Sequence, residues 1–95
     1  MELLAKETSG LLLVQVLEDR IDAAGAIQFK DRMRALAAHG PRRVMLDMSR
    51  VLFLDSSGLG AVVAVMKLLG PDCRLELSGL SPSVEKVFRL TRMDS

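Results

Sequence analysis

The sequence is short of the residues on which many functional sites depend. Its 95 residues include one cysteine, one histidine and three phenylalanines, with no tryptophan or tyrosine. A single Cys73 cannot form an internal disulfide, and His39 has no companion ligands for a metal. Acids, bases and nucleophiles do not cluster at a defined spacing, so we expect no catalytic residues, no enzyme activity and no cofactor.

Neither positive nor negative charge predominates in the sequence. Thirteen Lys and Arg against twelve Asp and Glu give a formal net charge of +1. This balance offers no basic face for a polyanion. Aromatic residues make up 3% of the chain, which removes the stacking platforms of single-strand binders. We therefore do not expect nucleic acid as a partner.

Long apolar runs are absent as well. The longest nearly apolar stretch, residues 58–66, ends at Lys67 and is far shorter than the roughly 18 residues of a membrane-spanning helix. The N-terminus lacks the basic and long apolar regions of a signal peptide. The sequence predicts a cytoplasmic protein without a membrane span, built as a single domain over residues 1–95.

Periodicity predicts alternating strands and helices. Strands are expected as a hairpin over residues 3–7 and 11–17, and then over 43–48 and 73–77; helices are expected over 23–39 and 59–69, and from Ser81 with helical spacing as far as Thr91. This order indicates an α/β fold. Its mixed sheet combines the N-terminal hairpin with parallel strands and packs against the helices.

Polar and small residues mark the helix starts. Asp22 is placed to cap the first helix, and residues 55–57 offer capping side chains to the second. Gly58 and Gly60 would let the first turn of the second helix approach a neighbouring element closely. Four methionines on apolar positions are expected to fill gaps in the core: Met33, Met45, Met48 and Met66.

The most unusual segment is residues 52–60, where a carboxylate and two hydroxyls lie between a strand and a helix. A helix N-terminus presents free N–H groups, so it would hold a phosphate on Ser56 or Ser57 without a basic side chain. Composition alone favours simple capping and does not distinguish the two hydroxyls. Nucleotide binding at this turn is a further alternative, but the segment is neither a Walker loop nor a dinucleotide fingerprint.

The same residues carry a family resemblance. The run Phe53-Leu54-Asp55-Ser56-Ser57-Gly58-Leu59-Gly60 closely resembles the signature of STAS domains of the bacterial anti-sigma factor antagonist type. Residues 20–23 are similar to the Gly-x-Leu-Asp segment of that family, and residues 81–84 with Phe88 resemble the start of its last helix. The resemblance covers nearly the whole chain in the expected order and implies a STAS-like fold.

The resemblance also implies a function. Ser56 would be phosphorylated by a partner serine kinase that is also an anti-sigma factor, with Ser57 as a supporting hydroxyl, and a serine phosphatase would reset the site. The unphosphorylated antagonist would bind the kinase and release its client. Asp22, Asp55, Ser57 and Gly58 are the expected partner-binding residues. Asp22 should lie near Ser56, since both follow strands at one end of a parallel sheet.

Two departures from the family pattern affect these expectations. Asp19 stands where the family usually has glycine, which would alter the interface loop. The chain ends at Ser95, about where a final helix would follow, so a truncated or minimal member is expected. Its uncovered apolar surface would favour a homodimer. The alternative function is a scaffold subunit of a transporter-associated or stress-signalling complex, in which Ser56 would only cap a helix.

Overall fold

A computed structural model describes residues 1–90 and shows a mixed sheet with helices packed against it. The strands are β1 (Leu3–Thr8), β2 (Leu11–Val16), β4 (Arg43–Asp47) and β6 (Arg74–Ser78), in the order β1-β2-β4-β6. β1 is antiparallel to β2, whereas β2, β4 and β6 are parallel. The helices are α1 (Ala23–Leu36), α2 (Ser56–Leu69) and α3 (Pro82–Leu90). The α/β prediction with an N-terminal hairpin is confirmed.

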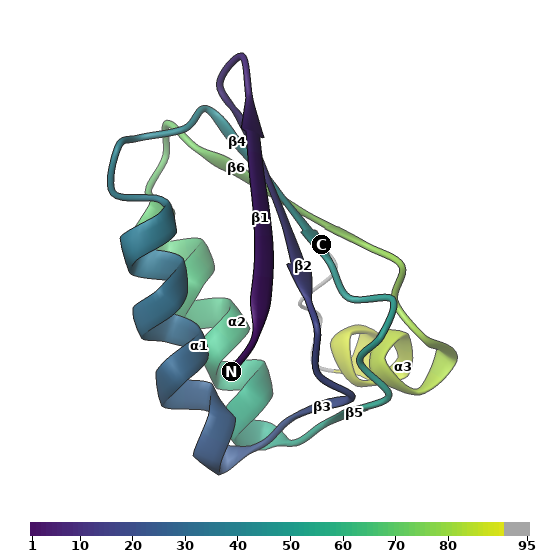
Figure 1. The fold of residues 1–95 in the computed structure, drawn as a ribbon. Coiled ribbons are helices and arrows are strands. Elements are labelled where there is room, and N and C mark those ends of the chain that lie inside the picture. The colour runs from purple at the N-terminus through teal and green to yellow at the C-terminus, as the bar shows by residue number, and fades with distance from the viewer. Residues whose placement is uncertain (91–95) are drawn as a thin grey trace.

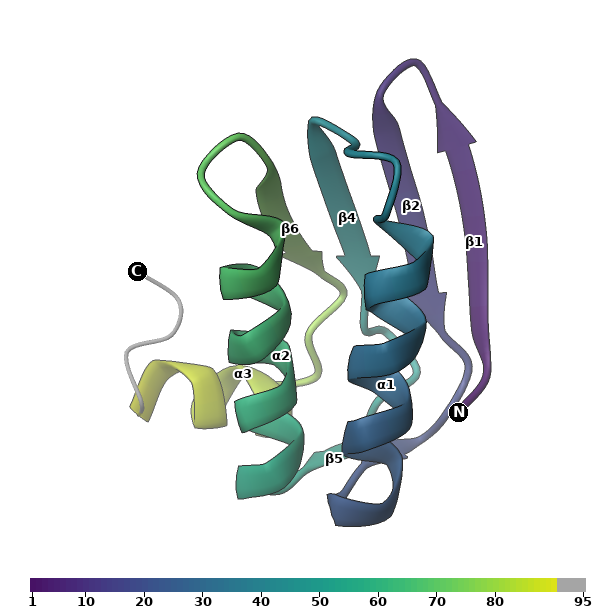
Figure 2. The ribbon, with the colours of Figure 1, turned by 90° about the vertical axis from the view of Figure 1, so that its left-hand side faces the viewer.

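The helices form two groups around the sheet. α1 and α2 lie side by side on one face, and both begin at the end to which the parallel strands run (Figures 1 and 2). α3 lies at that same end but on the other side of the sheet (Figure 1). The turns that lead into α1 and α2 therefore meet at one end of the molecule.

Most of the core lies between the sheet and the α1–α2 layer, and α3 adds Val84 and Phe88 to it from the other side. Every second residue of β2 is buried, which is the alternation of a strand with one covered face. The largest fully buried side chains include Phe29, Met33, Leu46, Met48 and Phe88. Because each such side chain stabilises the fold by about 1.5 to 3 kcal/mol, this small core fixes how the helices sit on the sheet.

Two helix boundaries differ from the prediction. α1 ends at Leu36, because Ala37 leaves the helical conformation and residues 37–39 form a turn. α2 begins at Ser56 and not at residue 59. Asp55 is extended and caps the helix, so the two serines and Gly58 form its first turn. The predicted helical position Thr91 lies outside the described residues.

A short ribbon was not predicted. β3 (Arg20–Ile21) and β5 (Phe53–Leu54) form a separate two-stranded parallel sheet just before α1 and α2. Strands of two residues are too short to show periodicity, so no pattern in the sequence predicts them.

The methionine prediction was partly wrong. Met33 and Met48 are fully buried and Met45 is half-buried, as expected for gap-filling side chains. Met66, on α2, is 37% exposed, so it does not fill a gap in the core.

Candidate functional site at the start of α2

The β3–β5 ribbon brings two capping aspartates to the same place. Ile21 pairs with Leu54 in parallel register, so the next residues, Asp22 and Asp55, follow neighbouring strands at one edge. Adjacent strands lie about 4.8 Å apart. The expected proximity of Asp22 to the Ser56 turn is therefore built into the strand pairing.

Asp55 is the N-cap of α2. Its backbone is extended, and its Oδ1 accepts a hydrogen bond from the Gly58 N–H at 2.8 Å. Its carbonyl oxygen accepts the first helical bond, from the Leu59 N–H at 2.9 Å. The carboxylate thus satisfies one of the free donors at the helix start and places its charge at the positive end of the helix dipole.

Asp22 has the same role in α1. Its Oδ1 accepts from the Gly25 N–H at 3.1 Å, and its carbonyl accepts from the Ala26 N–H at 2.8 Å. The predicted caps of both helices are confirmed. Since both side chains are only half-buried, each carboxylate also remains accessible from solvent.

Gly58 holds the two turns together. A β-carbon at this position would lie 2.2 Å from the Ile21 carbonyl oxygen and 2.8 Å from Leu54 Cδ1. Only glycine allows the first turn of α2 to press against the end of β3. The same expectation for Gly60 was wrong, because a β-carbon there would meet nothing within 4 Å.

The two hydroxyls are presented outward. Ser56 is the first residue of α2, Ser57 is the second, and both side chains are exposed. Within residues 1–90 neither hydroxyl has a hydrogen-bond partner, so each is accessible for covalent modification. The Gly58 N–H is already bound by Asp55 Oδ1, so it is not free to hold the phosphate of a nucleotide.

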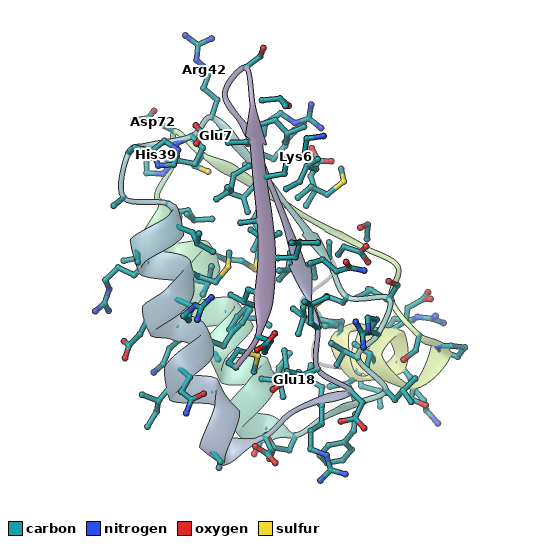
Figure 3. All side chains as sticks on the ribbon, in the orientation of Figure 1. Lys6, Glu7, Glu18, His39, Arg42 and Asp72 are labelled. Atoms are coloured by element: carbon teal, nitrogen blue, oxygen red, sulfur yellow. The ribbon has the colours of Figure 1, made fainter. Side chains whose placement is uncertain are left out.

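A polar hollow adjoins the Asp22 side of the site. It measures about 370 Å³, and its lining includes Glu18, Asp19, Arg20, Asp22 and Gln28. Figure 3 shows Glu18 near β3, at the end of the molecule where α1 and α2 begin. The site is therefore an open surface with a shallow recess and not an enclosed pocket.

Other candidate residues lie at the opposite end. His39 and Glu7 meet there, with Nε2 and Oε1 2.7 Å apart, and both side chains are solvent-accessible (Figure 3). Cys73 lines a groove of about 420 Å³ between the last turns of α1 and α2. Burial raises the pKa of the Cys73 thiol, which makes it a weaker nucleophile than an exposed cysteine.

Across residues 1–90, no three His, Cys, Asp or Glu side chains come together in a way that could hold a metal ion. No helix in this range is both long and apolar enough to cross a bilayer.

The chain is similar in sequence to proteins of a known family. Residues 9–95 match the family model described as "Mlab, STAS domain". The chain belongs to the STAS domain family. Among curated STAS relatives, it is 33% identical over 81 residues to the putative anti-sigma factor antagonist BtrV of Bordetella bronchiseptica. That match covers 84% of this chain and 70% of BtrV.

Solved STAS structures share the fold. An anti-sigma factor antagonist from Mycobacterium paratuberculosis superposes with a TM-score of 0.87 at 27% identity, covering 98% of this chain and 79% of that one. The Bacillus protein SpoIIAA, solved in its phosphorylated form, gives a TM-score of 0.70 at 20% identity, covering 98% and 86% of the two chains. These similarities place this STAS domain with the bacterial anti-sigma factor antagonist type.

Proposed function

We propose that this protein is an anti-sigma factor antagonist that binds an anti-sigma serine kinase while Ser56 is unmodified, and is released when that kinase phosphorylates Ser56. The observation that carries the proposal is the unpaired, exposed Ser56 hydroxyl on the first turn of a helix whose cap is already supplied by Asp55. Modification of Ser56 removes no hydrogen bond that the fold depends on.

The chemistry of the switch is a phosphoryl transfer. The Ser56 oxygen attacks the γ-phosphorus of ATP, its proton passes to a base of the kinase, and ADP leaves. The product carries about −1.5 to −2 charges at pH 7. Free N–H groups and the dipole of α2 stabilise this charge in the protein, so the fold is retained.

The same charge opposes binding. The phosphate joins Asp55 and Asp22 on a surface that must lose water when the kinase docks. Like-charge repulsion and desolvation then weaken the complex without any change of shape. A serine phosphatase returns the protein to its binding state. In this cycle the protein is a cytoplasmic regulatory ligand and not an enzyme.

The role of each site residue follows from its position. Asp22 and Asp55 present carboxylates to the partner, Ser57 supports the acceptor as a neighbouring hydroxyl, and Gly58 keeps the two turns in contact. Because Asp22 and Asp55 also cap helices, their contribution to binding has to be separated from their contribution to folding.

The experiment is binding and phosphorylation with the anti-sigma-type serine kinases encoded in the same genome. Wild type and Ser56→Ala should bind one of them, and Ser56→Asp should bind at least about tenfold more weakly. With ATP, intact mass should show one added phosphate on wild type and on Ser57→Ala, and none on Ser56→Ala. If no kinase of the set binds or modifies wild type, the proposal is wrong, and a non-switching scaffold subunit becomes the better explanation.

A further inference from the structure

Two large apolar side chains are exposed directly before the acceptor turn. Leu52 is 64% exposed and Phe53 is 50% exposed, whereas the next residue, Leu54, is buried. The alternation of β5 explains why Leu54 points into the core and Phe53 points out. It does not explain why Phe53 is apolar, nor why Leu52, which precedes the strand, is exposed as well.

The backbone holds these side chains in a fixed position. The N–H groups of Leu52 and Phe53 both donate to the Asp19 carbonyl oxygen, at 2.7 and 3.2 Å. Phe53 is also paired in register with Arg20 of β3. An apolar group that is already ordered loses little conformational entropy when a partner covers it, which favours binding.

Arg20 connects this apolar surface to the polar hollow. Its guanidinium lies over the Phe53 ring, 5.9 Å from the ring centroid, and its side chain also lines the hollow beside Asp22. The arrangement has an apolar centre next to a polar, solvent-accessible rim. Protein interfaces that bind tightly have this anatomy, and aromatic and arginine side chains are enriched at their energetic centres.

The short distance between Phe53 and Ser56 points to the kinase as the protein that binds this apolar surface. Phe53 precedes Ser56 by three residues, so the two are separated by at most about 10 Å of extended chain. A stable interface covers about 800 Å² on each partner, a patch much wider than this separation. A kinase that takes the Ser56 oxygen into its active site is therefore within reach of Phe53 and Leu52.

We propose that Leu52 and Phe53 form the apolar anchor through which the serine kinase recognises this protein, with Arg20 as the residue that positions the Phe53 ring. This inference rests on the proposed function. The matching surface of the kinase is an apolar recess close to its catalytic cleft. The anchor gives affinity to the unphosphorylated protein, and the charge at Ser56 controls release.

The test compares Phe53→Ser and Leu52→Ser with two controls of similar exposure. Leu4→Ser alters a side chain of β1 that is 59% exposed, and Leu68→Ser alters one that is 46% exposed, roughly 18 Å further along α2 from Ser56. Affinity for the kinase that phosphorylates wild type is measured by calorimetry, and the fold of each variant is checked by circular dichroism.

We expect Phe53→Ser to weaken binding by about thirtyfold and Leu52→Ser by about tenfold, with both controls close to wild type. Phe53→Leu should retain most of the affinity, which separates loss of apolar contact from loss of fold. If Phe53→Ser does not fold, Leu52→Ser decides the question.

Three results would overturn the anchor while leaving the proposed function intact. In the first, wild type is bound and phosphorylated but the position 52 and 53 variants bind equally well. In the second, all four serine variants lose affinity together. In the third, Phe53→Ser converts a dimer of this chain to a monomer without changing kinase affinity, which would assign the patch to a second copy.

Discussion

Gly58 and the Ile21 carbonyl oxygen pack so closely that a β-carbon at position 58 would lie 2.2 Å from that oxygen. This contact presses the first turn of α2 against the end of β3. It also explains why two turns that are far apart in the sequence act as one surface.

Gly58→Ala should therefore destabilise the protein by about 1 to 3 kcal/mol or more, because the obstructing atom is backbone and cannot rotate away. Gly60→Ala is the matched control in the same helix. It should stabilise the protein by about 0.5 to 1 kcal/mol, since its β-carbon meets nothing and alanine favours the helix. Urea denaturation measures both; equal effects would contradict the close contact.

Asp55→Ala should lower stability by about 1 kcal/mol, because the Gly58 N–H loses its acceptor. Asp55→Asn keeps an acceptor oxygen and should stay within a few tenths of a kcal/mol of wild type. The asparagine variant therefore removes the charge without removing the cap. Kinase affinity measured on it reports the role of the carboxylate in binding; a loss of stability equal to that of alanine would show that the charge itself stabilises the fold.

Met33→Ala and Met66→Ala test the division between core and surface on the two helices. Met33 is fully buried, so its truncation should cost about 2 to 5 kcal/mol. Met66 is 37% exposed, and its truncation should cost well under about 1 kcal/mol. Thermal unfolding of both variants is the measurement. Similar losses would mean that Met66 packs more tightly than the structure shows.

Cys73 should react slowly with iodoacetamide at pH 8, because burial raises the pKa of its thiol and keeps it protonated. The rate should increase when the chain is unfolded in urea. A raised pKa in the folded state also sets the sign of the pH effect on stability. The contribution of this group is fully present below the pKa of the unfolded thiol and is lost as the pH rises through the folded pKa. Cys73→Ala should therefore lose less stability than wild type in the alkaline range.

Much of the fold was predictable because its signals are local. Asp22 and Asp55 mark helix starts by their side-chain chemistry, and the apolar spacing of α1 shows which of its faces is buried. The β3–β5 ribbon was not predictable, since each of its strands exists only through pairing with a distant segment.

The candidate site also has features that the sequence predicts and features that only the packing reveals. Gly58 and Gly60 look alike in the sequence, and only the packing of Ile21 distinguishes them. The motif pointed to Ser56, but it did not reveal that Phe53 is exposed beneath a guanidinium, because that depends on the outward face of a strand too short to recognise.

The β3–β5 pairing has a consequence for signalling. The surface around Ser56 is assembled from residues 20–22 and 53–58, so it does not exist in a peptide or an unfolded chain. Under the proposed function, a kinase that depends on both segments would modify only folded molecules. The amount of phosphorylated protein in a cell would then depend only on correctly folded antagonist, because misfolded copies would not be phosphorylated.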